Sequence, residues 1–159
     1  MKTLIVYAGF SGTSRECADI LSQELSGETS LVDLAKSKKV DLSKYDTIAL
    51  GGSVRMGKIH KAVKHFIENN AETLMTKNLG IFMCCASVED YAKQRDDAFP
   101  KELQEHAVDV AHFGAKYNWD NMNFFIRSMM KKMTKDTQEP TINQSRISDF
   151  AKKLSENSR

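Results

Sequence analysis

The chain has 159 residues and a formal net charge of +2 at pH 7, with 41% hydrophobic and 28% charged residues. This size is typical of one globular domain that needs no disulfide or metal, so we expect a single domain over residues 1–159. The longest apolar run, residues 80–86, is far shorter than the ~18 residues of a membrane span, and the weak net charge does not indicate a nucleic-acid partner.

The cysteines and histidines do not form a disulfide or metal-binding pattern. Cys17, Cys84 and Cys85 are odd in number, so we expect reduced thiols, with the adjacent Cys84 and Cys85 buried in a strand. The four histidines show no i, i+4 pair and no neighbouring Cys-x-x-Cys, so no metal site is expected. The first residues, MKTLIVYAG, lack the long apolar stretch of a signal peptide and fit a strand, which favours a cytoplasmic location.

Apolar runs and helical periodicity alternate along the chain. In chain order they predict a strand at Lys2–Tyr7, a helix around Cys17–Leu25, strands at Thr29–Leu34 and Thr47–Leu50, a helix at Ile59–Leu74, a strand at Asn78–Cys85, a helix at Pro100–Ala107, a strand at Val108–Phe113 and a helix at Ser145–Leu154. The strands are nearly continuously apolar, which is typical of a parallel sheet covered on both faces. We therefore expect an open α/β fold.

An additional segment at about residues 116–141 separates the last predicted strand from the last helix, where a short turn would suffice. Within residues 119–135, Met and Phe residues recur at helical spacing, with Arg127, Lys131, Lys132 and Lys135 among them. A basic amphipathic helix of this kind binds membrane surfaces, quinones or partner proteins. Met-rich stripes also pack on sheets. Both roles stay open, and the first would place the protein peripherally at the inner face of the membrane.

The first loop, Gly9-Phe-Ser-Gly-Thr-Ser14, predicts a phosphate site. Its glycines allow backbone N–H groups to face one centre, its hydroxyls add donors, and the next helix presents its positive N-terminus. The alternative is an ordinary helix cap. Two glycines and three hydroxyls in six residues exceed what capping requires, so we favour phosphate.

Two phosphate-binding motifs can be set aside. Residues Gly52 to Lys58 match the spacing G-x-x-x-x-G-K, but Ile59 occupies the position of the Mg²⁺-binding Ser or Thr, which argues against a nucleoside triphosphatase. The chain has no G-x-G-x-x-G dinucleotide motif.

Two stretches carry a family resemblance. GFSGTS resembles the T/S-x-T-G-x-T phosphate loop of flavodoxins, and the order of elements over nearly the whole chain is similar to theirs. YDTIALGGSVRMGKIHKAVKHFIENN and KYNWDNMNFFIRSMMKKMTKDT resemble the flavodoxin-like, menaquinone-dependent protoporphyrinogen oxidases of bacteria. The resemblance implies a flavodoxin-like, five-stranded parallel sheet of order 2-1-3-4-5 with helices on both faces.

The resemblance also implies FMN as the cofactor. Its phosphate would lie on Phe10, Ser11, Gly12, Thr13 and Ser14. Its isoalloxazine would lie against Ser53, Val54, Arg55, Met56, Gly57 and Lys58, and against the loop of Ala86, Ser87, Val88 and Tyr91. The chain departs from the pattern in that its first loop begins with Gly9 and its 53–58 loop has no aromatic residue. Tyr91 or Trp119 either stacks on the ring or packs elsewhere.

The charges around the proposed ring bear on the reaction. Arg55 and Lys58 flank it, and a cation ~5 Å away at an effective dielectric of ~20 is worth on the order of 3 kcal/mol, or roughly 100 to 150 mV per electron. This makes the flavin less reducing and favours a quinone acceptor. The leading hypothesis is therefore an FMN oxidoreductase resembling the protoporphyrinogen oxidases, without an assigned acid or base. The alternatives are a flavodoxin that carries electrons between protein partners and a non-redox protein that binds another phosphorylated ligand.

Overall fold

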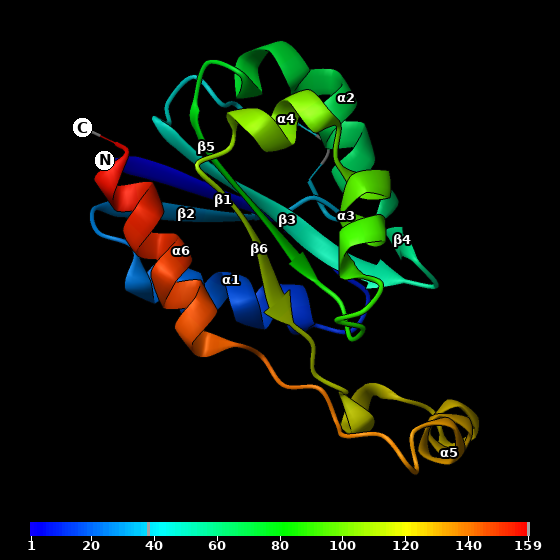
Figure 1. Ribbon diagram of the computed structural model, residues 1–159. Helices are drawn as coiled ribbons and strands as arrows, with labels where there is room; N and C mark the ends of the chain where they lie inside the picture. The colour runs from blue at the N-terminus through cyan, green and yellow to red at the C-terminus, as the bar shows by residue number, and fades with distance from the viewer. Residues whose placement is uncertain (38, 159) are drawn as a thin grey trace.

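Five parallel strands form the centre of the computed structural model, which describes residues 1–37 and 39–158 (Figure 1). They are β1 (Lys2–Ala8), β2 (Glu28–Asp33), β3 (Thr47–Arg55), β5 (Asn78–Cys84) and β6 (Asp109–Gly114). Their order is β2-β1-β3-β5-β6, with every neighbouring pair parallel. This confirms the predicted order 2-1-3-4-5 once the short strand β4 (Lys58–Ile59), which pairs only with β3 at its end, is set aside.

Helices cover both faces of the sheet (Figure 1). On one face, α1 (Thr13–Glu24) and α6 (Gln144–Glu156) pack into a core cluster with Phe82 and Phe113. On the other, α2 (Lys61–Leu74), α3 (Tyr91–Ala98) and α4 (Lys101–His106) share a second cluster. The central strands are buried on both sides, which explains their continuously apolar sequence.

Two features of the helices differ from the sequence prediction. Helix α3 was not predicted, because its sequence YAKQRDDA lacks an apolar stripe and buries only Ala98. Helix α2 begins at Lys61 and not at the predicted Ile59, because Ile59 belongs to a hairpin in which it pairs with Val54. The imidazole Nδ1 of His60 then accepts a hydrogen bond from the backbone N–H of Ala62 and caps the helix.

The carboxyl ends of the central strands meet at one edge of the sheet. The register places Ala8 opposite Gly52, Ser53 opposite Cys84, and Cys84 opposite Gly114. The loops that follow β1, β5 and β6, and the hairpin that ends β3, therefore start from the same edge. In open α/β sheets this edge is where ligands bind.

The additional segment leaves β6 at Gly114 and returns at Ile142, which forms an antiparallel bridge to Gly114. It contains η1 (Trp119–Asn121) and α5 (Phe124–Met133), and Figure 1 shows α5 apart from the sheet. No residue of α5 is buried, and the side chains of Phe124 and Phe125 are 88% and 76% exposed. The sequence left open whether this helix packs on the sheet or binds a membrane, quinone or partner, and the structure does not show it packed on the sheet. None of the described helices is both long enough and apolar enough to span a bilayer.

The three cysteines are free and buried, which confirms the predicted burial of Cys84 and Cys85, although Cys85 lies just after the end of β5 and not in the strand. Cys84 ends β5 and belongs to the cluster under α1 and α6, whereas Cys85 belongs to the opposite cluster. Burial raises the pKa of the Cys85 thiol to about 11, so this thiol is protonated at neutral pH.

Candidate functional site

The loop after β1 leaves the first turn of α1 free to bind an anion. Gly12 is the N-cap and has φ of 91°, a left-handed conformation that glycine adopts without strain. Among the described residues, no side chain caps this turn. The amides at the start of the helix are therefore available, and the helix dipole adds positive potential.

The hydroxyls of Thr13 and Ser14 turn toward the protein. Thr13 Oγ1 donates to the Lys116 carbonyl over 3.1 Å, and Ser14 Oγ shares a hydrogen bond with Ser53 Oγ inside the protein. Both residues are buried. The donors that remain in this loop for a phosphate are backbone amides and the Ser11 hydroxyl. Of the three hydroxyls expected as donors, those of Thr13 and Ser14 are engaged within the protein.

The Ser14–Ser53 pair also explains why the loop begins with glycine. A Cβ at Gly9 would lie 2.9 Å from Ser14 Oγ and 3.1 Å from Ser53 Oγ. The departure of Gly9 from the flavodoxin motif is therefore a packing requirement of this chain. The contact joins the loop after β1 to the end of β3, which are the two segments predicted to hold the phosphate and the ring.

The β3–β4 hairpin carries the second predicted part of the site. Arg55 pairs with Lys58 across it, and Met56 and Gly57 form a two-residue turn with φ of 52° and 76°. Positive φ at both positions is typical of a type I′ turn, which matches the twist of a hairpin. The turn leaves Met56 96% exposed beside two cations.

Phe10 connects the hairpin to the first loop. The Arg55 guanidinium lies 4.3 Å from the centre of the Phe10 ring, a cation–π contact. The His60 ring lies against the same phenyl ring with the centroids 4.8 Å apart. Burial lowers the pKa of His60, with Lys61 and Arg55 acting in the same direction, so the neutral ring is favoured.

The loop after β5 is closed by its own hydrogen bonds. Ser87 Oγ accepts from the backbone N–H of Asp90 and donates to its carboxylate, while Val88 is 77% exposed. Tyr91 starts α3 and turns inward, with its ring stacked on His112 at a centroid distance of 4.7 Å. Burial raises the pKa of Tyr91. The structure shows Tyr91 packed on His112, and its contact with the flavin ring stays a prediction.

The base of the additional segment contributes residues that the sequence analysis did not assign to the site. Asn118 donates a side-chain hydrogen bond to the Ser11 carbonyl over 3.2 Å, and Lys116 Nζ lies 3.3 Å from the Glu16 carboxylate. Ligands of open α/β sheets bind at the carboxyl ends of the strands, and both residues follow the last strand, so the sequence could have indicated them. Trp119 packs within the segment, against Tyr117 and hydrogen-bonded to Glu139, and its contact with the ring stays a prediction.

A flavodoxin domain family matches residues 4–144 of this sequence, which include the sheet, apart from the first two residues of β1, and every helix before α6. The chain belongs to the flavodoxin family. A 77-residue stretch is 32% identical to the protoporphyrinogen IX dehydrogenase [quinone] of Escherichia coli K12, covering 46% of this chain and 42% of the enzyme. This chain therefore matches less than half of that relative's length.

Solved structures of flavodoxins share the fold. A short-chain flavodoxin associated with a PDU bacterial microcompartment superposes with a TM-score of 0.60 at 16% identity, covering 100% of this chain and 99% of that one. A Fusobacterium nucleatum flavodoxin mutant bound to flavin mononucleotide gives 0.53 at 12% identity, covering 98% and 96%. At these identities the likeness concerns the fold. FMN is the cofactor of the flavodoxin family, in agreement with the cofactor expected from the sequence.

The residues at the sheet edge fit FMN. The first turn of α1 offers uncapped amides to a phosphate. Exposed apolar side chains of three segments, Phe10, Met56 and Val88, lie beside the strand ends and offer surface to a ring system. These are the same three segments that the sequence analysis assigned to the site.

Proposed function

We propose that this protein binds FMN at the carboxyl edge of its sheet and is an oxidoreductase that passes electrons from a reduced organic substrate to a quinone. The observation that carries the proposal is the uncapped first turn of α1, held beside the β3–β4 hairpin by the Ser14–Ser53 hydrogen bond. FMN, when bound, supplies hydride and single-electron chemistry. Porphyrinogen oxidation is the substrate chemistry that the partial likeness to the E. coli enzyme supports.

The protein's own residues position the cofactor in this proposal. Amides of residues 11–14 hold the phosphate, and Asn118 fixes the loop from outside by binding the Ser11 carbonyl. Arg15 is paired with Asp19 and Lys116 with Glu16, so the nearby cations are already neutralised by carboxylates. The helix N-terminus is then the main source of positive potential for the phosphate.

The two cations of the hairpin would raise the potential of the bound flavin. A less reducing flavin suits an acceptor of high potential better than it suits the role of a strongly reducing electron carrier. Arg55 and Lys58 face each other across the hairpin, and neither forms an ion pair with a described residue. Unpaired positive charge near the ring site stabilises added negative charge on reduction. This supports a quinone acceptor.

Helix α5 is the proposed contact with the membrane in which quinones dissolve. Its exposed apolar residues are Phe124, Phe125, Ile126, Met129 and Met133. Lys131 and Lys132 lie in its last turn. Apolar side chains combined with lysines suit the interface of an anionic bilayer. The base of the same segment contacts the phosphate loop through Asn118, so a protein anchored by α5 would hold the cofactor site close to the bilayer.

The test is the visible spectrum of the purified protein followed by turnover. We expect a yellow protein that releases FMN on heating, and that oxidises protoporphyrinogen IX only when a menaquinone analogue is added. A protein that stays colourless with excess FMN would contradict the cofactor, and a yellow protein without this turnover would contradict the substrate.

The second candidate function is electron transfer between protein partners. The fold shared with flavodoxins over nearly their full length favours it. A protein that contains FMN, is reduced by a flavodoxin reductase and passes electrons to a protein acceptor, without quinone-dependent turnover, would support this function over the first.

A further inference from the structure

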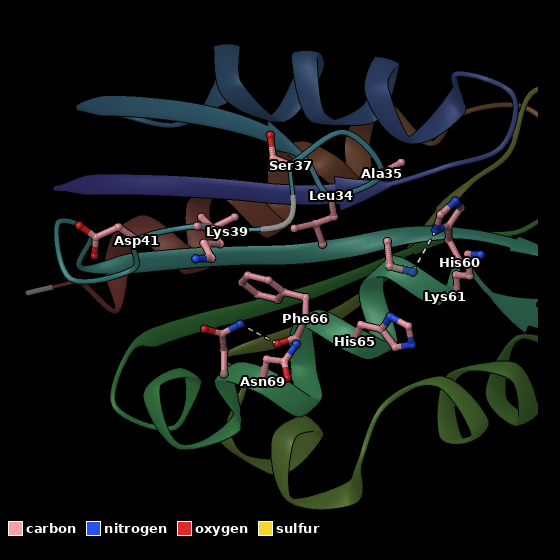
Figure 2. A pocket seen from close by; sticks show the side chains of 13 residues that line it. Leu34, Ala35, Ser37, Lys39, Asp41, His60, Lys61, His65, Phe66 and Asn69 are labelled. Atoms are coloured by element: carbon pink, nitrogen blue, oxygen red, sulfur yellow. Dashed lines mark hydrogen bonds between the residues drawn. The ribbon is translucent and has the colours of Figure 1, made fainter.

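A cavity of about 990 Å³ lies between α2 and the residues that follow β2, of which 34, 35, 37 and 39–41 line it (Figure 2). Its volume is in the range of small-molecule sites. Figure 2 shows the Phe66 side chain pointing from α2 toward this segment, where Leu34 faces it. With Val40 and Ala62, these side chains give the cavity an apolar floor that continues into the core.

The rim of the cavity carries unpaired positive charge. Lys39 and Lys61 line it and form no ion pair with any described residue. The Asp41 carboxylate, which accepts hydrogen bonds from the backbone N–H and the hydroxyl of Ser43, also lines the cavity, so the two lysines outnumber the one acidic group. The exposed side chains of His65 and Asn69 also line the rim. The rim therefore suits an anion.

Aromatic rings line the α2 side of the same space. Phe66 forms part of the floor, and His60 and His65 lie at the rim on the side of the α2 N-terminus. Flat ring systems bind well against aromatic faces. A polyphosphate would leave this apolar floor uncovered, and a neutral apolar molecule would leave the two lysines unpaired.

We propose that this cavity binds an aromatic carboxylate, with its flat apolar body against Phe66 and Leu34 and its carboxylate at Lys39 or Lys61. The site is distinct from the phosphate loop but adjoins it, because His60 lines the cavity and also lies against Phe10. The choice of a porphyrin as the probe rests on the proposed function, and FMN content is measured separately from porphyrin binding, so failure of one can be told from failure of the other.

The test uses the full chain, with its FMN content measured in every sample. Protoporphyrin IX, a planar dicarboxylate, is titrated by its fluorescence and compared with its dimethyl ester, which has the same ring without the negative charges. We expect saturable binding of the acid and at least tenfold weaker binding of the ester. The double variant Lys39→Glu with Lys61→Glu should weaken binding of the acid at least tenfold.

Lys64→Glu is the matched control, because Lys64 is exposed on α2 but does not line this cavity. It should bind protoporphyrin IX as the wild type does. The proposal is overturned if the acid does not bind, if the ester binds as tightly, if the lysine reversals have no effect, or if palmitate binds in place of the porphyrin. Retained FMN in the double variant would show that a loss of binding does not reflect unfolding.

Discussion

Ser14 Oγ and Ser53 Oγ share a buried hydrogen bond that joins the N-terminus of α1 to the end of β3. The two residues come from segments 39 positions apart, and both are less than a tenth exposed. Each hydroxyl satisfies the other, so the contact fixes the distance between the phosphate loop and the hairpin without leaving a polar atom unpaired.

The Ser14–Ser53 hydrogen bond should make the effects of removing its two hydroxyls on the free energy of unfolding non-additive. Ser14→Ala or Ser53→Ala leaves the other hydroxyl buried without its partner, and we expect each to lower the free energy of unfolding by about 1–3 kcal/mol. The double variant should cost less than the sum of the two. Urea unfolding measures all four proteins. Ser22→Ala, on the same helix, is the control and should change stability by less than ~0.5 kcal/mol. Strict additivity would contradict the pairing.

His60 should make stability depend on pH in a specific direction. Its pKa lies below the ordinary value of 6.5, because burial disfavours the charged ring. Protonation also removes the Nδ1 lone pair that caps α2. The stabilising contribution of the neutral ring is therefore fully present above pH 6.5 and is lost as pH falls through the lower folded-state pKa.

His60→Asn tests this dependence, because asparagine can cap a helix but does not titrate. As the pH falls below 6.5, the free energy of unfolding should fall more steeply in the wild type than in the variant. Parallel curves over that range would contradict the assignment.

Lys58 should raise the potential of the bound cofactor. At a distance of about 5 Å and an effective dielectric between ~80 and ~20, one cation is worth about 1 to 3 kcal/mol, or roughly 40 to 130 mV per electron. Lys58→Gln should lower the midpoint potential by an amount in that range, and the difference should shrink at high salt. Potentiometric titration measures it, with Lys64→Gln on α2 as the control. Equal potentials for Lys58→Gln and the wild type would remove the electrostatic argument for a quinone acceptor.

Helix α5 should bind anionic vesicles through its exposed aromatic residues. Phe124→Ser with Phe125→Ser removes the two most exposed phenyl rings, and we expect partitioning to fall at least tenfold. Met75→Ser, an exposed apolar position at the end of α2, is the control and should partition as the wild type does. Vesicle sedimentation is the measurement. Unchanged partitioning of the double variant would contradict membrane contact through this helix.

The sequence was sufficient for the sheet but not for every part of the site. Continuous apolar runs predict the buried strands, because parallel strands covered on both faces bury every side chain. The hairpin at Met56-Gly57 was missed, since its two-residue turn continues the glycine-rich end of β3 without a break in composition. The inward turn of Thr13 and Ser14 could not be predicted either, because it depends on Lys116 and Ser53, which are distant in the chain.

The most direct test of the central claim follows the backbone amides of a ¹⁵N-labelled protein during titration with FMN. We expect the largest changes in amide signals at residues 11–14, with saturation at one FMN per chain. Gly12→Ala strains the left-handed N-cap by about 1–2 kcal/mol and should weaken FMN binding about tenfold. Glu72→Ala, at an exposed position of α2, should leave FMN binding unchanged. FMN that binds without perturbing residues 11–14, or with equal affinity to Gly12→Ala, would contradict the phosphate site.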